Sequence, residues 1–457
     1  MMKKKFKKVM ILLAWLAILE FAAMLVHNSI LLVGPTEVMS RLWQLLHTVD
    51  FYQICLMSLF RIMVGMTAAF FLGCFFGACM YKWNLFEEII SPVLAVMKSI
   101  PVASFVVLLL IWQGSENLSV FISFIVVFPN ICVSMKNGLL AVPKEKMEMA
   151  KIFGMKGIGK WVYIYRPSVL PFLISCMEIS IGMSFKSGVA AEVIGTPDFS
   201  IGERIYVSKV YLDTAGLFAW TISLILLSFI VEKGILFLMR KALTPIRYGK
   251  NEVQNGKKNK SSLSSDSNHQ LVVDNISKSY GEKMVLNHIS MQLQKGGRYF
   301  LMAPSGSGKT TLLRIIAGLE TADEGRIEGN HAVTYMFQED RLLEEELTIT
   351  NIAPYTPARN KYLLAAGEIL PKDCMRKPAS QLSGGMKRRV ALLRAMLFQY
   401  DNPDAVCLLD EPFSGLDEET KRKVISFIIK YQNGRTMLIA SHNEADCELL
   451  SGILWKL

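Results

Sequence analysis

The sequence predicts two fold classes in one chain: an all-α membrane domain of six spans, residues 1–245, followed by an α/β domain, residues 271–457. Three observations support this division. Apolar runs near the roughly 20 residues that cross a bilayer fill the first half. Residues 246–270 are rich in Lys, Ser, Asn and Gly and are expected to form a flexible basic linker. Short Val/Ile/Leu-rich strands alternate with helical segments in the last part.

The composition agrees with a membrane domain. Of the 457 residues, 52% are hydrophobic, which is high for a purely soluble protein. The candidate spans lie at about 9–28, 54–81, 89–111, 117–135, 167–189 and 215–238. The first run follows the basic segment KKKFKK and could also be a secretory signal, although it is long for that purpose.

Charge placement predicts the orientation of the spans. The loop between the fourth and fifth spans is basic, whereas residues 112–116 carry only Glu116. The basic residues of that loop are Lys136, Lys144, Lys146, Lys151, Lys156, Lys160 and Arg166. With six spans, both chain ends and this loop are cytoplasmic in a multi-pass protein of the cell membrane. The same clustering beside the membrane accounts for much of the net charge of +11 and argues against nucleic-acid binding.

The cysteines do not indicate a metal site or a disulfide framework. There are eight, with no CxxC pair and no suitable His partners, and five of them lie in apolar stretches. We therefore expect buried thiols.

The segment RYFLMAPSGSGKTTLLRIIAGL indicates a phosphate-binding loop. An apolar strand, a Gly/Ser loop and a helix opening at Lys309 would direct backbone N–H groups at phosphate, with Lys309 adding a cation and Thr310 a hydroxyl for Mg²⁺. One departure from the usual pattern is Ala303 in place of the first glycine. Its Cβ can stiffen the turn. The predicted phosphate-binding set is Ser305, Gly306, Ser307, Gly308, Lys309, Thr310 and Thr311.

A second acidic motif, AVCLLDEP, ends a hydrophobic strand in two carboxylates. Asp410 is placed to hold Mg²⁺ and Glu411 to polarise an attacking water. An acidic pair alone is often only a turn, so its weight comes from the motifs around it. These are LSGGM at 382–386, SGLD at 414–417, Gln338 after the strand VTYMF, and Ser441-His442 after the strand TMLIA.

With these motifs in this order, residues 271–457 resemble ATP-binding-cassette (ABC) ATPases over nearly their whole length. The resemblance implies ATP and Mg²⁺ as cofactors, with each ATP between two chains. It implies that Tyr280 stacks on adenine and that Ser383, Gly384 and Gly385 cover the γ-phosphate held by the opposite subunit. The metal is then held by Thr310, Gln338 and Asp410, and Gln338 also senses the γ-phosphate. Glu411 is the implied general base, and His442 is implied to contact the γ-phosphate. The chain is shorter than the family pattern on both sides of Gln338, so we expect trimmed strands and a reduced helical subdomain.

The basic loop at 143–166 contains MEMAKIFGMKGIGKWVYIYRP. Glu148, Ala150 and Gly154, with Ile164 and Pro167, have the spacing of the loop that bacterial import permeases present to their ATPase. The alternative is a plain interfacial amphipathic helix. Met149 and Arg166 depart from the pattern, since an apolar residue is usual at position 166.

Residues 35–240 also resemble the permeases of the nitrate, sulfonate and taurine importer family. The segments that carry this resemblance are SLFRIMVG, MKSIPVASFVVLLLIWQG, FPNICVSMKNGLLAVP and GVAAEVIG. The resemblance implies uptake of a small, anionic organic or inorganic solute across a bacterial membrane, delivered by a separate extracytoplasmic substrate-binding protein. A homodimer is the simplest complete machine. The alternatives are a heterodimer with an unfused subunit, an exporter, and a non-transporting membrane ATPase that transmits force.

Ionisable residues within predicted spans are candidates for function, because exposing them to lipid is costly. Glu20, Arg61 and Lys186 meet this criterion. Arg61 lies near a span end and could snorkel; Glu20 could pack between spans or lie shallow; Lys186 could line a pathway or pair with Glu192.

Overall fold

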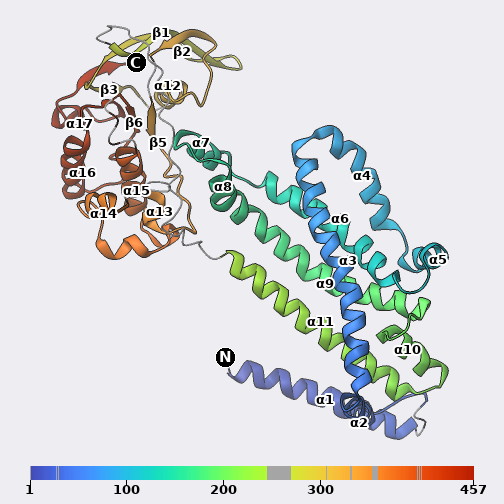
Figure 1. Cartoon of the computed structure of the whole chain (residues 1–457). Coiled ribbons are helices and arrows are strands. Elements are labelled where there is room, and N and C mark those ends of the chain that lie inside the picture. Colours follow the sequence, from blue (N-terminus) through green and yellow to red (C-terminus); the bar gives the residue numbers. More distant parts are fainter. Residues whose placement is uncertain are drawn as a thin grey trace. The chain divides into compact units, whose positions relative to one another are not determined.

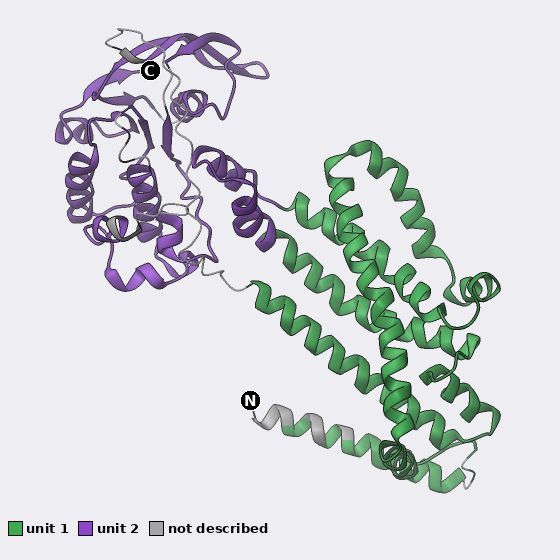
Figure 2. Cartoon of the chain, in the orientation of Figure 1, with its two compact units in different colours: residues 1–141, 168–243 green, residues 142–167, 244–457 purple. Residues whose placement is uncertain are grey.

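The computed structural model describes residues 2–26, 28, 30–243, 269–304, 306–329, 332–352, 359–398, 400, 402 and 404–457. The chain divides into two compact units, one of residues 1–141 and 168–243 and the other of residues 142–167 and 244–457 (Figure 2). The basic loop therefore belongs to the same unit as the α/β domain. Most of the predicted linker lies outside the described residues, and its last two residues, 269 and 270, begin strand β1.

The described part of the first unit is helical (Figure 1). Its helices are α1 (Met2–Val26), α2 (Pro35–Leu46), α3 (Val49–Lys82), α4 (Asn84–Ser99), α5 (Val102–Gln113), α6 (Leu118–Leu140), α9 (Arg166–Gly195), α10 (Ile201–Val210) and α11 (Thr214–Leu243). The sequence analysis did not predict helices α2 and α10. It selected apolar runs long enough to span a bilayer, and both of these helices are shorter.

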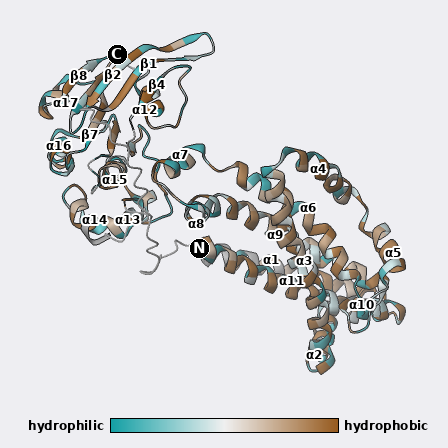
Figure 3. Ribbon diagram, turned by 45° about the horizontal axis from the view of Figure 1, so that its top comes forward, coloured by the Kyte–Doolittle hydropathy of each residue, from teal (hydrophilic) through white to brown (hydrophobic). Residues whose placement is uncertain are grey.

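Four helical segments are long and apolar enough to cross a membrane: α3, α6, α11 and residues Gly157–Gly195, which include α9. The predicted span at 89–111 is instead the pair α4 and α5, bent by 102°. The break lies at Ile100–Pro101, where the proline restricts the residue before it to an extended conformation. In α1 the apolar part is the shorter segment Leu13–Val26. The described residues thus give four spans, or five if the bent pair counts as one, and six stays a prediction. Figure 3 shows the apolar character of these helices.

Close packing of α3 against α6 forms the centre of this unit. A Cβ added at Gly65 would lie 2.1 Å from the carbonyl oxygen of Val120, and one at Gly77 would lie 2.5 Å from that of Cys132. Glycines here let two helix backbones approach, as is common between membrane helices.

The second unit contains two sheets (Figure 1). An antiparallel sheet has the order β2-β1-β4, from β1 (His269–Tyr280), β2 (Lys283–Gln294) and β4 (Glu324–Glu328). A parallel sheet has the order β5-β6-β7-β3-β8, from β3 (Arg298–Met302), β5 (Val333–Met336), β6 (Val406–Asp410), β7 (Thr436–Ser441) and β8 (Ile453–Lys456). Ligands of such sheets bind at the carboxyl ends of the parallel strands.

Helices complete this unit. They are α7 (Lys144–Ile152), α8 (Gly157–Lys160), a π-helical turn (Trp161–Tyr165), α12 (Lys309–Ile316), α13 (Thr348–Ile352), α14 (Arg359–Ala366), α15 (Gly384–Leu397), α16 (Glu418–Tyr431) and α17 (Glu444–Leu449), with 3₁₀ turns at Lys372–Arg376 and Ala379–Gln381. The helices α13 and α14, between β5 and α15, are short. All eight cysteines of the chain are free thiols, and each is buried or half-buried.

Candidate functional site

The predicted phosphate loop joins β3 to α12. Gly306 and Gly308 adopt φ values of 82° and 95°, which favour glycine. A Cβ at Gly308 would also lie 2.9 Å from the carbonyl oxygen of Val285. Ala303 is not among the described residues with positive φ, so the alanine at this position needs no backbone strain. Ser305 of the predicted set lies outside the described residues.

Polar groups in and beside this loop fit a phosphate group and a magnesium ion. Lys309 Nζ donates to the carbonyl oxygens of Ala303, at 2.5 Å, and Pro304, at 2.9 Å. The buried Ser307 hydroxyl has no hydrogen-bond partner among the described residues. The Thr310 hydroxyl hydrogen-bonds to Asp410. A cation, an unpaired hydroxyl and oxygen ligands therefore meet at a helix N-terminus, which is the donor set that phosphate and Mg²⁺ require.

The two carboxylates at the end of β6 have different surroundings. Asp410 is 1% exposed and accepts a hydrogen bond of 3.3 Å from Tyr335 Oη. Burial raises the pKa of Asp410, and hydrogen bonds from Thr310 and Tyr335 oppose that rise. Glu411 leaves the strand with φ of 49°, and its Oε1 lies 3.9 Å from Nδ1 of the largely exposed His442. One carboxylate is thus fixed, while the other faces an accessible imidazole.

Arg388 of α15 connects the end of β6 to the segment after β5. One guanidinium nitrogen donates to the carbonyl oxygens of Phe337, at 3.0 Å, and Gln338, at 2.6 Å. The other donates to those of Asp410, at 2.6 Å, and Glu411, at 2.5 Å. The sequence analysis missed this residue, although it lies four positions into the helix that the LSGGM motif begins. The Gln338 side chain is exposed.

The LSGGM motif caps α15 and presents an open surface. The Ser383 hydroxyl accepts a hydrogen bond of 3.4 Å from Met386 N. A Cβ added at Gly384 would meet nothing within 4 Å. Over the described residues, no hydrogen bond or ion pair joins Ser383, Gly384 or Gly385 to the phosphate loop of the same chain. The structure therefore does not bring these two predicted halves of a site together within one chain.

Tyr280, by contrast, lies near the phosphate loop. Its hydroxyl donates to Glu320 and hydrogen-bonds to Thr311 of α12. The residue is 49% exposed, and Lys278 Nζ lies 5.7 Å from the ring centroid. An aromatic face beside the loop is therefore open to a flat partner.

The basic loop docks on the α/β domain through Glu148 of α7. Its carboxylate accepts two hydrogen bonds from Arg314, at 2.7 and 2.9 Å, and one of 2.6 Å from Arg341. The hydrogen bonds from Arg314, and then those from Arg341, lower the pKa of Glu148 to about 2. Arg314 lies in the helix that starts at Lys309, and Arg341 lies three residues after Gln338. One carboxylate is thus bound to both elements that are expected to respond to phosphate.

Apolar contacts continue this docking. Met149, Ala150, Phe153 and Met155 are buried against residues of the α/β domain. The Phe153 ring lies edge-on to Phe398 at 5.1 Å. Gly154, with φ of 60°, follows the end of the helix and allows the chain to turn. Helix α7 is therefore packed on the α/β domain through Glu148 and Ala150, whereas Gly154 is exposed beyond its end.

The departure at Arg166 has a partner in the same unit. Arg166 Nη2 lies 3.6 Å from Glu346 Oε1, and Glu346 is 4% exposed. Burial raises the pKa of Glu346, and the charge of Arg166 opposes the rise. The unusual arginine is therefore matched by an unusual buried carboxylate.

Two of the ionisable residues in predicted spans have defined partners. Arg61 does not snorkel: its Nη2 lies 2.5 Å from Glu116 Oε2 and 3.2 Å from the carbonyl oxygen of Asp198. Glu20 accepts hydrogen bonds from the backbone nitrogen of Thr36, at 3.0 Å, and from its hydroxyl, at 2.6 Å, at the start of α2. Both residues join segments that are distant in sequence.

Lys186 does not pair with Glu192. The Glu192 carboxylate accepts hydrogen bonds from the hydroxyls of Ser58, at 2.8 Å, and Ser119, at 3.1 Å, and from the backbone nitrogen of Gly202, at 3.2 Å. Lys186 is exposed. Glu192 is thus part of a buried polar network that holds α3, α6 and α10 to α9.

Comparison with known proteins identifies both halves. Residues 286–414 match the family described as ABC transporter, and residues 65–241 match the binding-protein-dependent transport system inner membrane component. The Sulfate/thiosulfate import ATP-binding protein CysA of Mesostigma viride is 34% identical over 197 residues, 38% of this chain and 56% of the relative. The Spermidine/putrescine import ATP-binding protein PotA of Protochlamydia amoebophila is 30% identical over 202 residues, 40% of this chain and 53% of the relative.

The chain spans about half of the length of these two relatives. A solved dimeric structure of a bacterial ABC transporter cassette aligns with a TM-score of 0.36 at 24% identity, covering 41% of this chain and 94% of that one. Neither relative's name points to the nitrate, sulfonate and taurine importers that the permease motifs resemble. The chain therefore contains an ABC ATPase domain and, ahead of it, a permease domain of the binding-protein-dependent kind.

Proposed function

We propose that this chain is half of an ATP-driven importer that takes up a small anion delivered by a separate substrate-binding protein. The observation that carries the proposal is the docking of Glu148 on Arg314 and Arg341. It connects a permease loop to the phosphate-loop helix and to the segment after Gln338. Movement of either element on ATP binding then displaces α7 and, through it, the spans.

The ATPase roles follow from the geometry described above. Glu411 accepts a proton from the attacking water, and His442, 3.9 Å away, orients the same region. With ATP bound, Lys309 would exchange its carbonyl partners for phosphate oxygens, and Tyr280 would stack on adenine. Thr310, Gln338 and Asp410 would hold Mg²⁺, which would neutralise charge on the phosphates. Arg388 fixes the backbones of Gln338 and Glu411 relative to one another.

The complete machine is a homodimer of this chain. Two observations support this. Ser383, Gly384 and Gly385 are free of the phosphate loop of their own chain within the described residues, and Gly384 has open space in front of it. A second copy places these residues over the ATP of the first, and it also supplies the second permease half. Each copy crosses a bacterial membrane six times, with both chain ends in the cytoplasm. An exporter is the weaker reading, because α7 carries the import-type motif.

The test is ATP hydrolysis by the full chain in lipid vesicles, with and without a candidate binding protein loaded with taurine, nitrate or sulfate. Glu411→Gln is expected to lower the rate by about 100-fold or more, because it removes the base. Glu419→Gln is the matched control, since Glu419 is exposed and pairs only with Lys423 in the described structure. A rate that needs Glu411 and rises with one loaded binding protein supports an importer. A rate that ignores every binding protein while vesicles accumulate an amphipathic dye would instead establish an exporter.

A further inference from the structure

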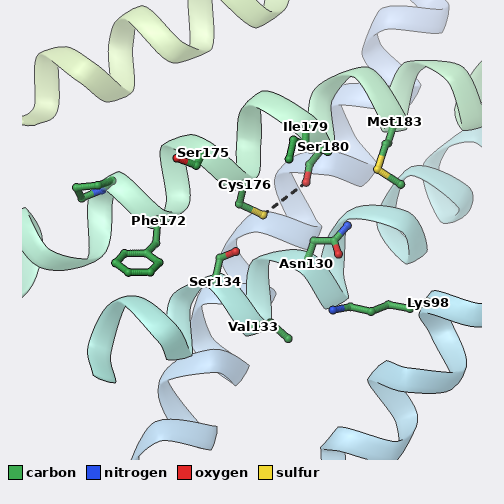
Figure 4. A pocket seen from close by; sticks show the side chains of 11 residues that line it. Lys98, Asn130, Val133, Ser134, Phe172, Ser175, Cys176, Ile179, Ser180 and Met183 are labelled. Atoms are coloured by element: carbon green, nitrogen blue, oxygen red, sulfur yellow. Dashed lines mark hydrogen bonds between the residues drawn. The ribbon is translucent and has the colours of Figure 1, made fainter. Parts of the chain in front are cut away.

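The first unit contains a cavity of about 650 Å³ between α4, α6 and α9 (Figure 4). This volume is within the usual range for small-molecule sites. Its polar lining consists of the Lys98 ammonium, the Asn130 amide and the hydroxyls of Ser134, Ser175 and Ser180. Among the residues that the structure describes, no carboxylate lines it. The cavity therefore offers donors and one positive charge, which is the chemistry of an anion site.

Lys98 supplies the charge in the lining of this cavity. Within the described part of the chain its Nζ has no carboxylate partner, whereas Arg61 and Lys136 both have one. Lys98 also lies inside the apolar run at 89–111 and meets the criterion that selected Glu20, Arg61 and Lys186. The sequence analysis missed it. Lys98 is exposed near the end of α4, so its ammonium is accessible to an anion that enters the cavity.

The polar groups of the cavity come from three helices. Asn130 lies near the middle of α6, and Ser175 and Ser180 lie near the middle of α9. Lys98 reaches toward Asn130 from the end of α4, just before the break at Pro101 (Figure 4). The cavity thus lies beside the break between α4 and α5, and solute sites of transporters lie between such discontinuous helices.

The other walls of the cavity are apolar. Phe172, Ile179 and Met183 lie along one side of α9, and their exposed fractions are between 40% and 66%. A hydrated inorganic anion gains nothing from this wall. A small organic anion gains from both walls, with its charged end at Lys98 and its hydrocarbon on α9.

We propose that this cavity binds the transported solute, and that the solute is a small organic anion such as a short alkanesulfonate or carboxylate. The proposal rests on the proposed importer function, but the site can be tested without transport or ATP hydrolysis. Cys176 lines the same cavity, and its Sγ lies 3.6 Å from Ser180 Oγ. Its thiol is therefore a reporter of the charge inside.

The test uses the full chain in phosphatidylcholine vesicles, with the other seven cysteines replaced. The rate of Cys176 modification is measured with an anionic and a cationic methanethiosulfonate reagent. Each transfers its thioalkyl group to the thiolate as a disulfide and releases methanesulfinate. We expect Lys98→Met to lower the anionic-to-cationic rate ratio by about tenfold, as focusing by one charge in a cleft predicts. Lys98→Arg should retain the ratio, and propane-1-sulfonate should protect Cys176 only when residue 98 is basic.

Two controls make the result specific. Lys233→Met removes a cation of α11 whose recorded ion pair is with Glu232, and it should leave the ratio unchanged. A chain retaining only Cys55, which lies outside this cavity, should show no dependence on residue 98. A ratio that is unchanged in Lys98→Met overturns the proposal, even if the protein is an active importer. Protection by phosphatidylglycerol in the vesicles, but not by propane-1-sulfonate, also overturns it and assigns the cavity to lipid.

Discussion

Glu148 of α7 and Lys98 of α4 are both charged residues of the permease half, but their surroundings are opposite. Three hydrogen bonds from two arginines bind Glu148, whereas Nζ of Lys98 has no carboxylate partner within the described residues. A charge that is fully paired inside the fold gives a fixed mechanical connection. A charge that the fold leaves unpaired is available to a ligand. Under our two proposals, the paired charge transmits movement and the unpaired charge recognises the solute.

Reversing the paired charge is expected to have the largest effect. Glu148→Arg places a third guanidinium beside Arg314 and Arg341. It should weaken docking of α7 by about 2 kcal/mol or more, which is about thirtyfold. We expect the stimulation of ATP hydrolysis by a loaded binding protein to be lost, while basal hydrolysis persists. Glu145→Arg, at an exposed position of the same helix, is the control and should retain the stimulation. Retained stimulation in Glu148→Arg would contradict the mechanical role.

Giving the unpaired charge a partner is the converse experiment. Asn130→Asp adds a carboxylate to the wall of the cavity that contains Lys98. It should lower the anionic-to-cationic labelling ratio at Cys176 by about tenfold, as much as removal of Lys98 does. Asn137→Asp, at an exposed position of α6, makes the same chemical change elsewhere. Equal labelling ratios in the two variants would show that Lys98 does not set the charge of the cavity.

The pair between Arg166 and Glu346 is longer, at 3.6 Å, and its loss should matter less. We expect Arg166→Leu to lower the stimulated rate about threefold, which is less than about 1 kcal/mol. Without the cation, the already raised pKa of Glu346 rises further. A carboxyl whose pKa is raised on folding does not destabilise the fold at a pH below its unfolded pKa of about 4.3. It destabilises the fold as the pH rises through its folded pKa.

The melting-temperature deficit of Arg166→Leu should therefore widen as pH increases above about 4.3. Adding Glu346→Gln should remove this dependence, because no carboxyl then remains to ionise. A deficit that is constant with pH, or that the second substitution does not relieve, would show that the pair is not responsible.

The smallest expected effect concerns pH: Glu148 should add no pH dependence to the coupling of transport to ATP hydrolysis. Its pKa is lowered to about 2, so its stabilisation is present above the unfolded value of about 4.3 and is lost only as pH falls toward about 2. The ratio of solute transported to ATP hydrolysed should be flat between pH 5 and pH 8. A bend near pH 6 that Glu148→Gln abolishes would place a titrating carboxylate at the docking contact and contradict the paired state.

Local patterns predicted the local structure around much of the candidate site. The loop before α12, the carboxylates after β6 and the spacing of Glu148, Ala150 and Gly154 each lie within a short segment, where residue type and local conformation determine one another. The long apolar helices were predicted for the same reason. The bend at Pro101 was not, because an apolar run around it satisfied the length criterion for a span.

Partners distant in sequence could not be predicted. Snorkelling was considered for Arg61 because its partners could not be predicted. Glu116 and the backbone at Asp198 contact it only in the folded chain. Arg388 was missed since its four acceptors are backbone carbonyls, which every sequence contains. Glu346 gave no signal of its own, and only the unusual Arg166 pointed to a changed contact.

The contacts of Arg388 constrain how the ATPase can move. It donates to the carbonyl oxygens of Phe337, Gln338, Asp410 and Glu411, and its Nη1 also lies 3.5 Å from the Asp340 carboxylate. Carbonyl oxygens gain or lose no proton at any working pH, so these four hydrogen bonds persist whatever the charge of Asp340. One guanidinium therefore ties the start of the LSGGM helix to the backbone of Glu411 and to the segment that leads to Arg341. A shift of any one of these three segments is transmitted to the other two.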